Sequence, residues 1–187
     1  MQNKLEFVTG GSKVYRLAGN NWYAVTQDND KVMLVDTDCK IAGEELDPYG
    51  CVDCAYADGE NGQRILNYTN SIADKYFNNI KYAIEPRTVK ADTGELENAY
   101  MWPMSKEEFE DHEDIGGKIC KKIRGLVRTR TFIGNDIVWH VYDAKGALVN
   151  DNVCFAYSVA PAFYLRKSAI DHISEDGEIV LKPAITD

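Results

Sequence analysis

The stretch VCFAYSVAPAFYLRK, from Val153 to Lys167, alternates bulky with small side chains. Because successive side chains of a strand point to opposite faces, this alternation predicts a strand packed on one side by its large residues. Pro161 interrupts the pattern, and proline lacks the backbone N–H that a sheet ladder needs. The strand must therefore reach a sheet edge, a bulge or a change of pairing partner at Pro161. No nucleophile is paired with a base here, so the stretch predicts architecture rather than chemistry.

Three other segments have helical signatures. Apolar residues recur at helical spacing from Ile65 to Ile80, which predicts a long helix with one buried stripe. Ser105 and Glu108 form a capping box, which predicts the start of a short acidic helix, SKEEFEDH. From Ile115 to Ile123, apolar residues lie opposite lysines, so a second amphipathic helix is expected there.

The remaining patterns predict strands and one long loop. The runs KVYRLA, NWYAVTQ and KVMLVDTDC are separated by AGNN and DND, which are hairpin signals, so the chain should open with a meander. Ile41 to Gly62 is rich in Gly, Asp, Glu and Pro, which predicts a long surface loop. LVRTRTF, DIVWHVYDA and GEIVLKPAI are further strand candidates. This order predicts a single α+β domain over residues 1–187 with a mostly antiparallel sheet.

The charge of the chain disfavours nucleic acid as a partner. Net charge is −9, from 30 acidic and 21 basic residues, whereas nucleic-acid binding usually requires a basic surface. Basic residues concentrate in one place, either as a solvated helix face that leads into a strand or as a docking site for an acidic partner. These residues are Lys118, Lys121, Lys122, Arg124, Arg128 and Arg130. Without a long apolar run or a signal peptide, the chain is expected to be cytoplasmic and not bound to membrane.

The cysteines give a weak metal or redox signature. Cys51 and Cys54 have the spacing of half a zinc knuckle, but no second pair follows, and they lie among turn residues. A chain without an export signal normally keeps its thiols reduced. We therefore expect free thiols, with no metal and no cofactor.

Four landmarks, in order, resemble a C-type-lectin-like family of domains of unknown function from gut bacteria and their phages. They are NWYAVTQDNDKVMLVDTDC, IADKYFNNI, MWPMSKEEFEDH and a closing block of LVRTRT, NDIVWHVYDAKGALVNDN and SVAPAFYLRKSAI. The closing block is similar to the family's WLRSP, V-x-x-x-G and VRPALYLK motifs, although its tryptophan and Ser-Pro are missing and Ala160 replaces the arginine. The resemblance spans Trp22 to Ile170. It implies a C-type-lectin-like fold with two or three helices, a binding layer of long loops, and terminal strands that lie close together.

Loops between Thr131 and Asn152, joined by parts of the Ile41–Gly62 loop, are the expected binding face. Their mixture of aromatic, Asn and Asp residues is typical of protein-binding loops. The candidate residues are Asn135, Asp136, Trp139, His140, Tyr142, Asp143, Asn150, Asp151 and Asn152. The sequence therefore predicts a non-catalytic module that recognises a protein partner, with His140 and Tyr142 as anchors. The alternative is that Trp139 and its neighbours are core residues. The sequence does not indicate an oligomeric state.

Two other functions are compatible with the resemblance. A calcium-dependent lectin would need several converging oxygens, which Asp143, Asn150, Asp151 and Asn152 could supply. A metal- or cysteine-dependent enzyme would be related to the formylglycine-generating enzymes, which share a similar fold. The sequence has no Ser-His-Asp order and no glycine-rich phosphate loop, so no enzyme is predicted. Fold alone does not decide between these classes.

Overall fold

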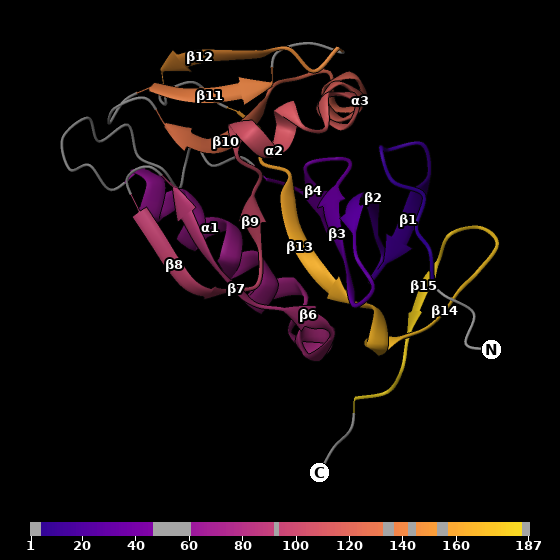
Figure 1. The fold of residues 1–187 in the computed structure, drawn as a ribbon. Helices are drawn as coiled ribbons and strands as arrows, with labels where there is room; N and C mark the ends of the chain where they lie inside the picture. The colour runs from indigo at the N-terminus through magenta and orange to yellow at the C-terminus, as the bar shows by residue number, and fades with distance from the viewer. Residues whose placement is uncertain are drawn as a thin grey trace.

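The computed structural model describes residues 5–46, 61–91, 94–132, 137–141, 145–152 and 157–184. They form an α+β fold whose strands are mostly antiparallel, as predicted (Figure 1). In these ranges no helix has the length and apolar character that crossing a membrane requires.

The main sheet has a central strand that joins two halves of the chain. The sheet runs in the order β1-β2-β3-β13-β6, and β9 also pairs with β13. Its strands are β1 (Val14–Leu17), β2 (Asn20–Gln27), β3 (Lys31–Asp36), β13 (Pro161–Arg166), β6 (Ile84–Glu85) and β9 (Trp102–Pro103). Every pairing among them is antiparallel. The predicted opening meander is thus confirmed as β1, β2 and β3.

Two tight turns produce the meander. Ala18 and Gly19 both have positive φ, of 51° and 76°, which matches the two-residue turn whose twist suits a hairpin. In the next turn Asp28 Oδ1 accepts from the backbone N–H groups of Asp30 and Lys31, both at 2.8 Å. Local side-chain chemistry therefore sets the register of the first three strands.

Pro161 is the first residue of β13, at a point where the chain changes its pairing partner. Before it, Ser158 donates its backbone N–H to Leu126 and accepts from Arg128, at 3.0 and 2.9 Å. After it, β13 pairs with β3 on one side and with β6 and β9 on the other, so the strand is central and not at an edge. Of the three predicted options, the structure has the change of partner. The upstream part of the predicted strand, residues 153–156, lies outside the described residues.

The predicted long helix is divided into two elements. α1 (Asn61–Tyr76) is an α-helix, and a 3-10 helix, η2 (Asn78–Ala83), follows it. Phe77 separates them with φ −123° and ψ 15°, a non-helical backbone conformation. Phe77 is buried, and its ring lies 5.8 Å from that of Trp22. Tertiary packing of Phe77, followed by two asparagines of low helix propensity, ends the helix before Ile80.

Both shorter helices are confirmed. α2 (Lys106–Glu110) begins at the predicted capping box, because Ser105 Oγ accepts from the backbone of Glu108 and Glu108 Oε2 accepts from the backbone of Ser105. α3 (Glu113–Ile123) follows and carries the predicted lysines. At Gly116 the Cβ of any other residue would lie 3.1 Å from Phe109 and 3.2 Å from Val141, so glycine permits close helix packing.

A second, three-stranded sheet lies beyond one end of the main sheet (Figure 1). Its strands are β10 (Val127–Phe132), β11 (Ile137–Val141) and β12 (Leu148–Asn152), with β11 in the middle. On one side, Val141 packs against Gly116 of α3. On the other, the ring of His140 stacks on that of Tyr157, with centroids 4.4 Å apart. The small sheet is thus supported on both faces.

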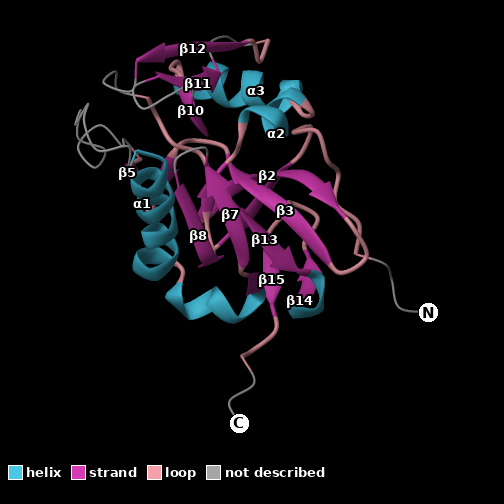
Figure 2. Cartoon of the chain, turned by 60° about the vertical axis from the view of Figure 1, so that its left-hand side comes forward, coloured by secondary structure: helices cyan, strands magenta, loops and turns pink. Residues whose placement is uncertain are grey.

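Three hairpins complete the fold (Figure 2). They pair β4 (Lys40–Ile41) with β5 (Glu44–Glu45), β7 (Arg87–Ala91) with β8 (Gly94–Ala99), and β14 (Ile170–Ile173) with β15 (Ile179–Leu181). Arg16 of β1 donates its backbone N–H to Gly177 at 2.9 Å, and Ile179 is buried in the core. The prediction that the terminal strand lies beside the first strands is therefore confirmed.

Two of the six clustered basic residues are in the interior, so the predicted solvated basic face is wrong for them. Arg128 and Arg130, on β10, are only 1% and 7% exposed. Arg130 binds Glu108 through both terminal nitrogens, at 2.5 and 3.1 Å. It also donates to the carbonyl oxygens of Lys90 and Pro103, at 3.0 and 2.7 Å. A partly buried carboxylate and two carbonyls can hold a guanidinium that composition alone would place on the surface.

Replacing Arg130 with alanine should lower the free energy of unfolding by about 2–3 kcal/mol, because the carbonyl oxygens of Lys90 and Pro103 lose their donor and the partly buried Glu108 loses its partner. Urea unfolding measures this loss. The control is Arg16→Ala, which removes an arginine whose ion pairs with Asp176 and Glu178 are exposed. That variant should lose less than about 1 kcal/mol. Equal losses in the two variants would contradict the structural role of Arg130.

Candidate functional site

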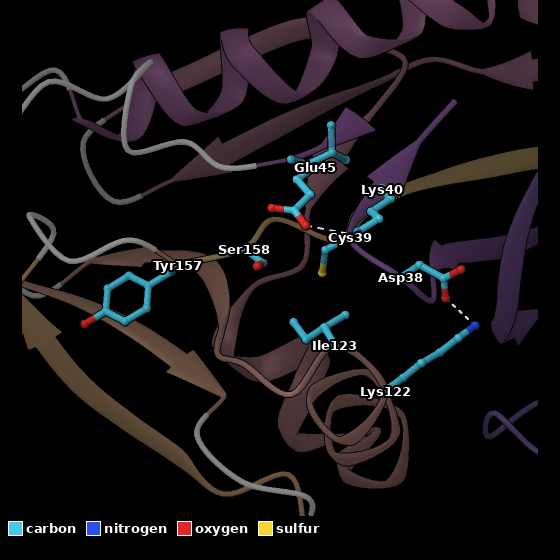
Figure 3. Close-up of a pocket in the computed structure, with 9 residues that line it drawn as sticks. Asp38, Cys39, Lys40, Glu45, Lys122, Ile123, Tyr157 and Ser158 are labelled. Carbon is cyan, nitrogen blue, oxygen red and sulfur yellow. Dashed lines mark ion pairs between the residues drawn. The ribbon is translucent and has the colours of Figure 1, made fainter. Parts of the chain in front are cut away.

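A pocket of about 420 Å³ opens where the main sheet, α3 and the segment after the small sheet meet (Figure 3). The residues that line it come from three separate parts of the chain. They are Asp38, Cys39, Lys40, Glu45, Leu46, Lys122, Ile123, Tyr157 and Ser158. Concave sites with a few convergent polar groups are where proteins usually bind ligands, so this is the candidate site.

Backbone hydrogen bonds fix the pocket walls. Leu46 donates its N–H to the carbonyl of Cys39, and Val159 donates to the carbonyl of Leu46, both at 2.9 Å. Cys39 has φ 50°, a left-handed conformation that turns the chain sharply after β3. Part of the predicted Ile41–Gly62 loop therefore does lie against the C-terminal block. Residues 47–60 of that loop are outside the described part of the chain.

Two ion pairs border the pocket. Lys122 pairs with Asp38 and donates to the hydroxyl of Thr37 at 2.8 Å, while Lys40 pairs with Glu45 at 3.0 Å. Burial by itself would raise the pKa of Asp38, but hydrogen bonds from Lys122, Thr37 and Asn21 outweigh it, and the pKa is lowered. Asp38 is thus an anion held in a defined position.

A buried carboxyl group lies behind this rim. Asp36, at the end of β3, is fully buried, and its Oδ2 accepts from the backbone of Lys40 at 3.0 Å. Its Oδ1 has no hydrogen-bond partner among the described residues. Burial, and to a smaller extent the charge of Asp38, raises the pKa of Asp36 to about 7, although hydrogen bonds and Lys122 act in the opposite direction. Asp36 therefore exchanges its proton near neutrality.

The thiol in the pocket wall is protonated. Burial raises the pKa of Cys39 well above its ordinary value, and Asp36 adds to the effect. Since the thiolate is the nucleophile and the metal ligand, Cys39 is chemically inert in this state. Cys39 and Cys120 are both buried, and neither forms a disulfide with another described residue. Among the described residues, no three His, Cys, Asp or Glu side chains are grouped to hold a metal ion, and Cys51 and Cys54 lie outside them.

The structure places the predicted binding residues in different environments. His140 is 1% exposed and stacks on Tyr157, so its side chain belongs to the support of the small sheet and is not a surface anchor. Asn150 and Asp151 are exposed on β12. Trp139 pairs with Asn150 in the β11–β12 ladder, and Asn152 is the last residue of β12. The other four candidates, Asn135, Asp136, Tyr142 and Asp143, lie outside the described residues.

Tyr157 connects the small sheet to the pocket. It is buried, lines the pocket and interacts with the side chain of Asp151. Burial raises the pKa of Tyr157 to about 12, and Asp151 raises it further, against the opposing effect of Arg128. Burial lowers the pKa of Arg128 to about 10, so this guanidinium stays charged at neutral pH. One predicted residue, Asp151, is therefore linked to the pocket by a rigid neighbour.

Replacing Asp36 with asparagine should change how stability depends on pH. Because the folded pKa of Asp36 lies above its ordinary value, native protein binds one more proton than unfolded protein between about pH 4 and 7. The stability that this proton supplies is complete below that window and is lost as pH rises to about 7. The Asp36→Asn variant should therefore become more stable relative to wild type by about 1.4 kcal/mol per pH unit. Urea unfolding at several pH values tests this.

The exposed Asp74 supplies the control, because 64% of its side chain is accessible. The variant Asp74→Asn also removes one carboxyl group and gives the comparison. A difference that changes equally with pH in both variants would rule out a special titration at Asp36.

The pocket can hold a polar ligand by several kinds of interaction. Its rim offers ammonium and carboxylate groups, and its floor combines the aliphatic side chains of Leu46 and Ile123 with the hydroxyl of Ser158. Figure 3 shows Cys39 and Ile123 turned toward one another, which makes the centre of the pocket apolar. This arrangement suits a side chain or small group with an apolar body and polar ends. Comparison of the chain with models of protein families, with curated proteins and with solved structures found no match.

Proposed function

We propose that the protein is a non-catalytic binding module that recognises a protein partner with its small sheet and the adjoining pocket. The observation that carries the proposal is the position of Tyr157, which lines the pocket and contacts Asp151 on the outermost strand of that sheet. Tyr157 therefore joins the exposed strand to the wall of the pocket. The polar strand and the partly apolar pocket match the composition of protein-binding sites.

Rigid support of the surface favours recognition. α3 packs on one face of the small sheet through Gly116 and Val141, and Tyr157 stacks on the other face through His140. Binding residues held in place before the partner arrives lose little conformational entropy when it binds. The buried His140 contributes to affinity only by keeping β12 in position.

The lectin alternative receives less support from the described residues. Asn150 and Asp151 are consecutive on β12, so their side chains point to opposite faces of the sheet. Two oxygens that diverge in this way do not both ligate one calcium ion, which requires converging ligands. A protein partner can contact both side chains along the edge of the strand.

The proposal includes a C-type-lectin-like arrangement. The neighbouring terminal strands and a separate layer beyond the main sheet support it, and the sequence motifs suggest origin in a gut bacterium or phage. In such a fold the layer beyond the sheet is the usual place for a binding face, consistent with function on loops carried by a rigid scaffold.

The double variant Asn150→Ala/Asp151→Ala should lose partner binding without unfolding. Tagged wild-type and variant proteins are used to capture partners from a lysate of the native host, and captured proteins are quantified by mass spectrometry. A genuine partner should bind the variant about tenfold more weakly, equivalent to about 1.4 kcal/mol. The melting temperature should fall by only a few degrees, because both side chains are exposed, although the contact of Asp151 with Tyr157 is lost.

The matched control is Thr88→Ala/Glu97→Ala, which removes two exposed polar side chains from the β7–β8 hairpin. A partner should be captured equally by wild type and by this control. If every captured protein is retained by the β12 variant, or lost equally from the control, then the small sheet is not the recognition surface.

A further inference from the structure

A cluster of cations and aromatic rings lies on the main sheet, away from the small sheet. At its centre Tyr164, on β13, is half-buried. Lys31 Nζ lies 4.7 Å from the centroid of the Tyr164 ring, and Arg87 Cζ lies 5.6 Å from it. Sheet register places Glu85 beside Tyr164 and Arg166 beside Lys31, so these side chains share one face.

The guanidinium of Arg87 is oriented by two rings. Its Cζ lies 5.1 Å from the centroid of Trp102 as well as near Tyr164, and the two rings are 5.5 Å apart. Cation–π contact engages the flat face of a guanidinium and leaves its N–H donors in the plane of the group. Nε makes only a long hydrogen bond of 3.4 Å, to the carbonyl of Thr88. Arg87 is thus held between two rings, and the planar fork of donors that every guanidinium has suits a carboxylate.

The positive charges of the cluster exceed the negative charges. Lys31 pairs with Glu85 at 2.5 Å, which neutralises one cation. Within the described part of the chain, no carboxylate forms an ion pair with Arg87 or with Arg166, whose Nη1 donates to the carbonyl of Tyr82 at 2.9 Å. Two partly buried arginines thus remain unneutralised on this face of a protein whose net charge is −9. Partial burial reduces the screening of these charges by water.

We propose that Arg87, Tyr164 and Arg166 form a second docking surface, which binds an acidic segment of a protein. A carboxylate of the segment accepts from the Arg87 fork, a second pairs with Arg166, and apolar atoms between them cover the Tyr164 ring. Nucleic acid fits less well, because the net negative charge of the whole chain repels a long polyanion. A short acidic segment experiences mainly the positive potential near Arg87 and Arg166.

This surface is independent of the one proposed for the small sheet. In Figure 1, β10, β11 and β12 lie at the top of the molecule, whereas β6 and the C-terminal end of β13 lie toward the bottom. A segment bound at Tyr164 therefore leaves the pocket and β12 accessible. Success or failure of either proposal leaves the other unaffected.

Fluorescence anisotropy tests the proposal with a labelled peptide that repeats Glu-Gly-Glu-Leu, compared with a matched Gln-Gly-Gln-Leu peptide. Wild-type protein should bind the glutamate peptide at least about tenfold more tightly, because charge-assisted hydrogen bonds are formed only with carboxylates. Arg87→Gln should weaken binding about tenfold. Arg87→Lys should also weaken it several-fold, because lysine keeps the charge but lacks the planar fork.

The control is Arg16→Gln, which changes net charge by the same amount at an arginine already paired with carboxylates. It should leave affinity within about twofold, and circular dichroism should show all variants folded. The proposal is overturned if Arg16→Gln weakens binding as much as Arg87→Gln, or if the glutamine peptide binds equally well. It is also overturned if a labelled oligothymidylate binds more tightly, or if sedimentation shows that the cluster binds a second copy of the chain instead.

Discussion

The contacts of one buried arginine join the small sheet to the main body of this protein. Arg130 lies on β10 of the small sheet, and its partners lie on α2, on β7 and on β9, which belong to the main body. A guanidinium has five donors in a fixed plane, so it can join several elements while each bond limits the orientation of the others. The position of β12 and of the pocket relative to the main sheet depends on this arrangement.

Two carboxyl groups at the pocket, those of Asp36 and Asp38, lie close in sequence but have different environments. Asp36 is fully buried, whereas Asp38 has the ammonium of Lys122 and two further donors as neighbours. Two residues along the same turn thus have pKa values shifted in opposite directions. Neighbouring carboxyl groups of this kind are common where proteins need one group that is permanently charged and another that titrates.

Local signals in the sequence predicted much of the fold. The capping box at Ser105, the apolar stripe of α1 and the turns of the meander depend on residues only a few positions apart, and the structure confirms them, although the α-helix ends at Tyr76 and not at Ile80. The burial of Arg128 and Arg130 was not predictable, because the carboxylate that pairs with Arg130 is 22 positions away. The pocket was missed for the same reason, since its walls come from three distant segments. His140 is a further example: only its tertiary contact with Tyr157 shows that it is internal.

The central place of β13 also determines the order in which the molecule can form. β3 pairs with β2 through a short turn, but its other edge pairs with a strand that begins at Pro161. During synthesis, the second edge of β3 has no partner until β13 has been made. More than half the chain lies between the two strands, and Val32 and Leu34 of β3 lack this neighbour until then. Pairings of such long sequence separation form slowly, because the intervening chain must first be closed into a loop. Until then an unpaired hydrophobic edge is exposed to other chains, which makes the nascent meander prone to aggregation.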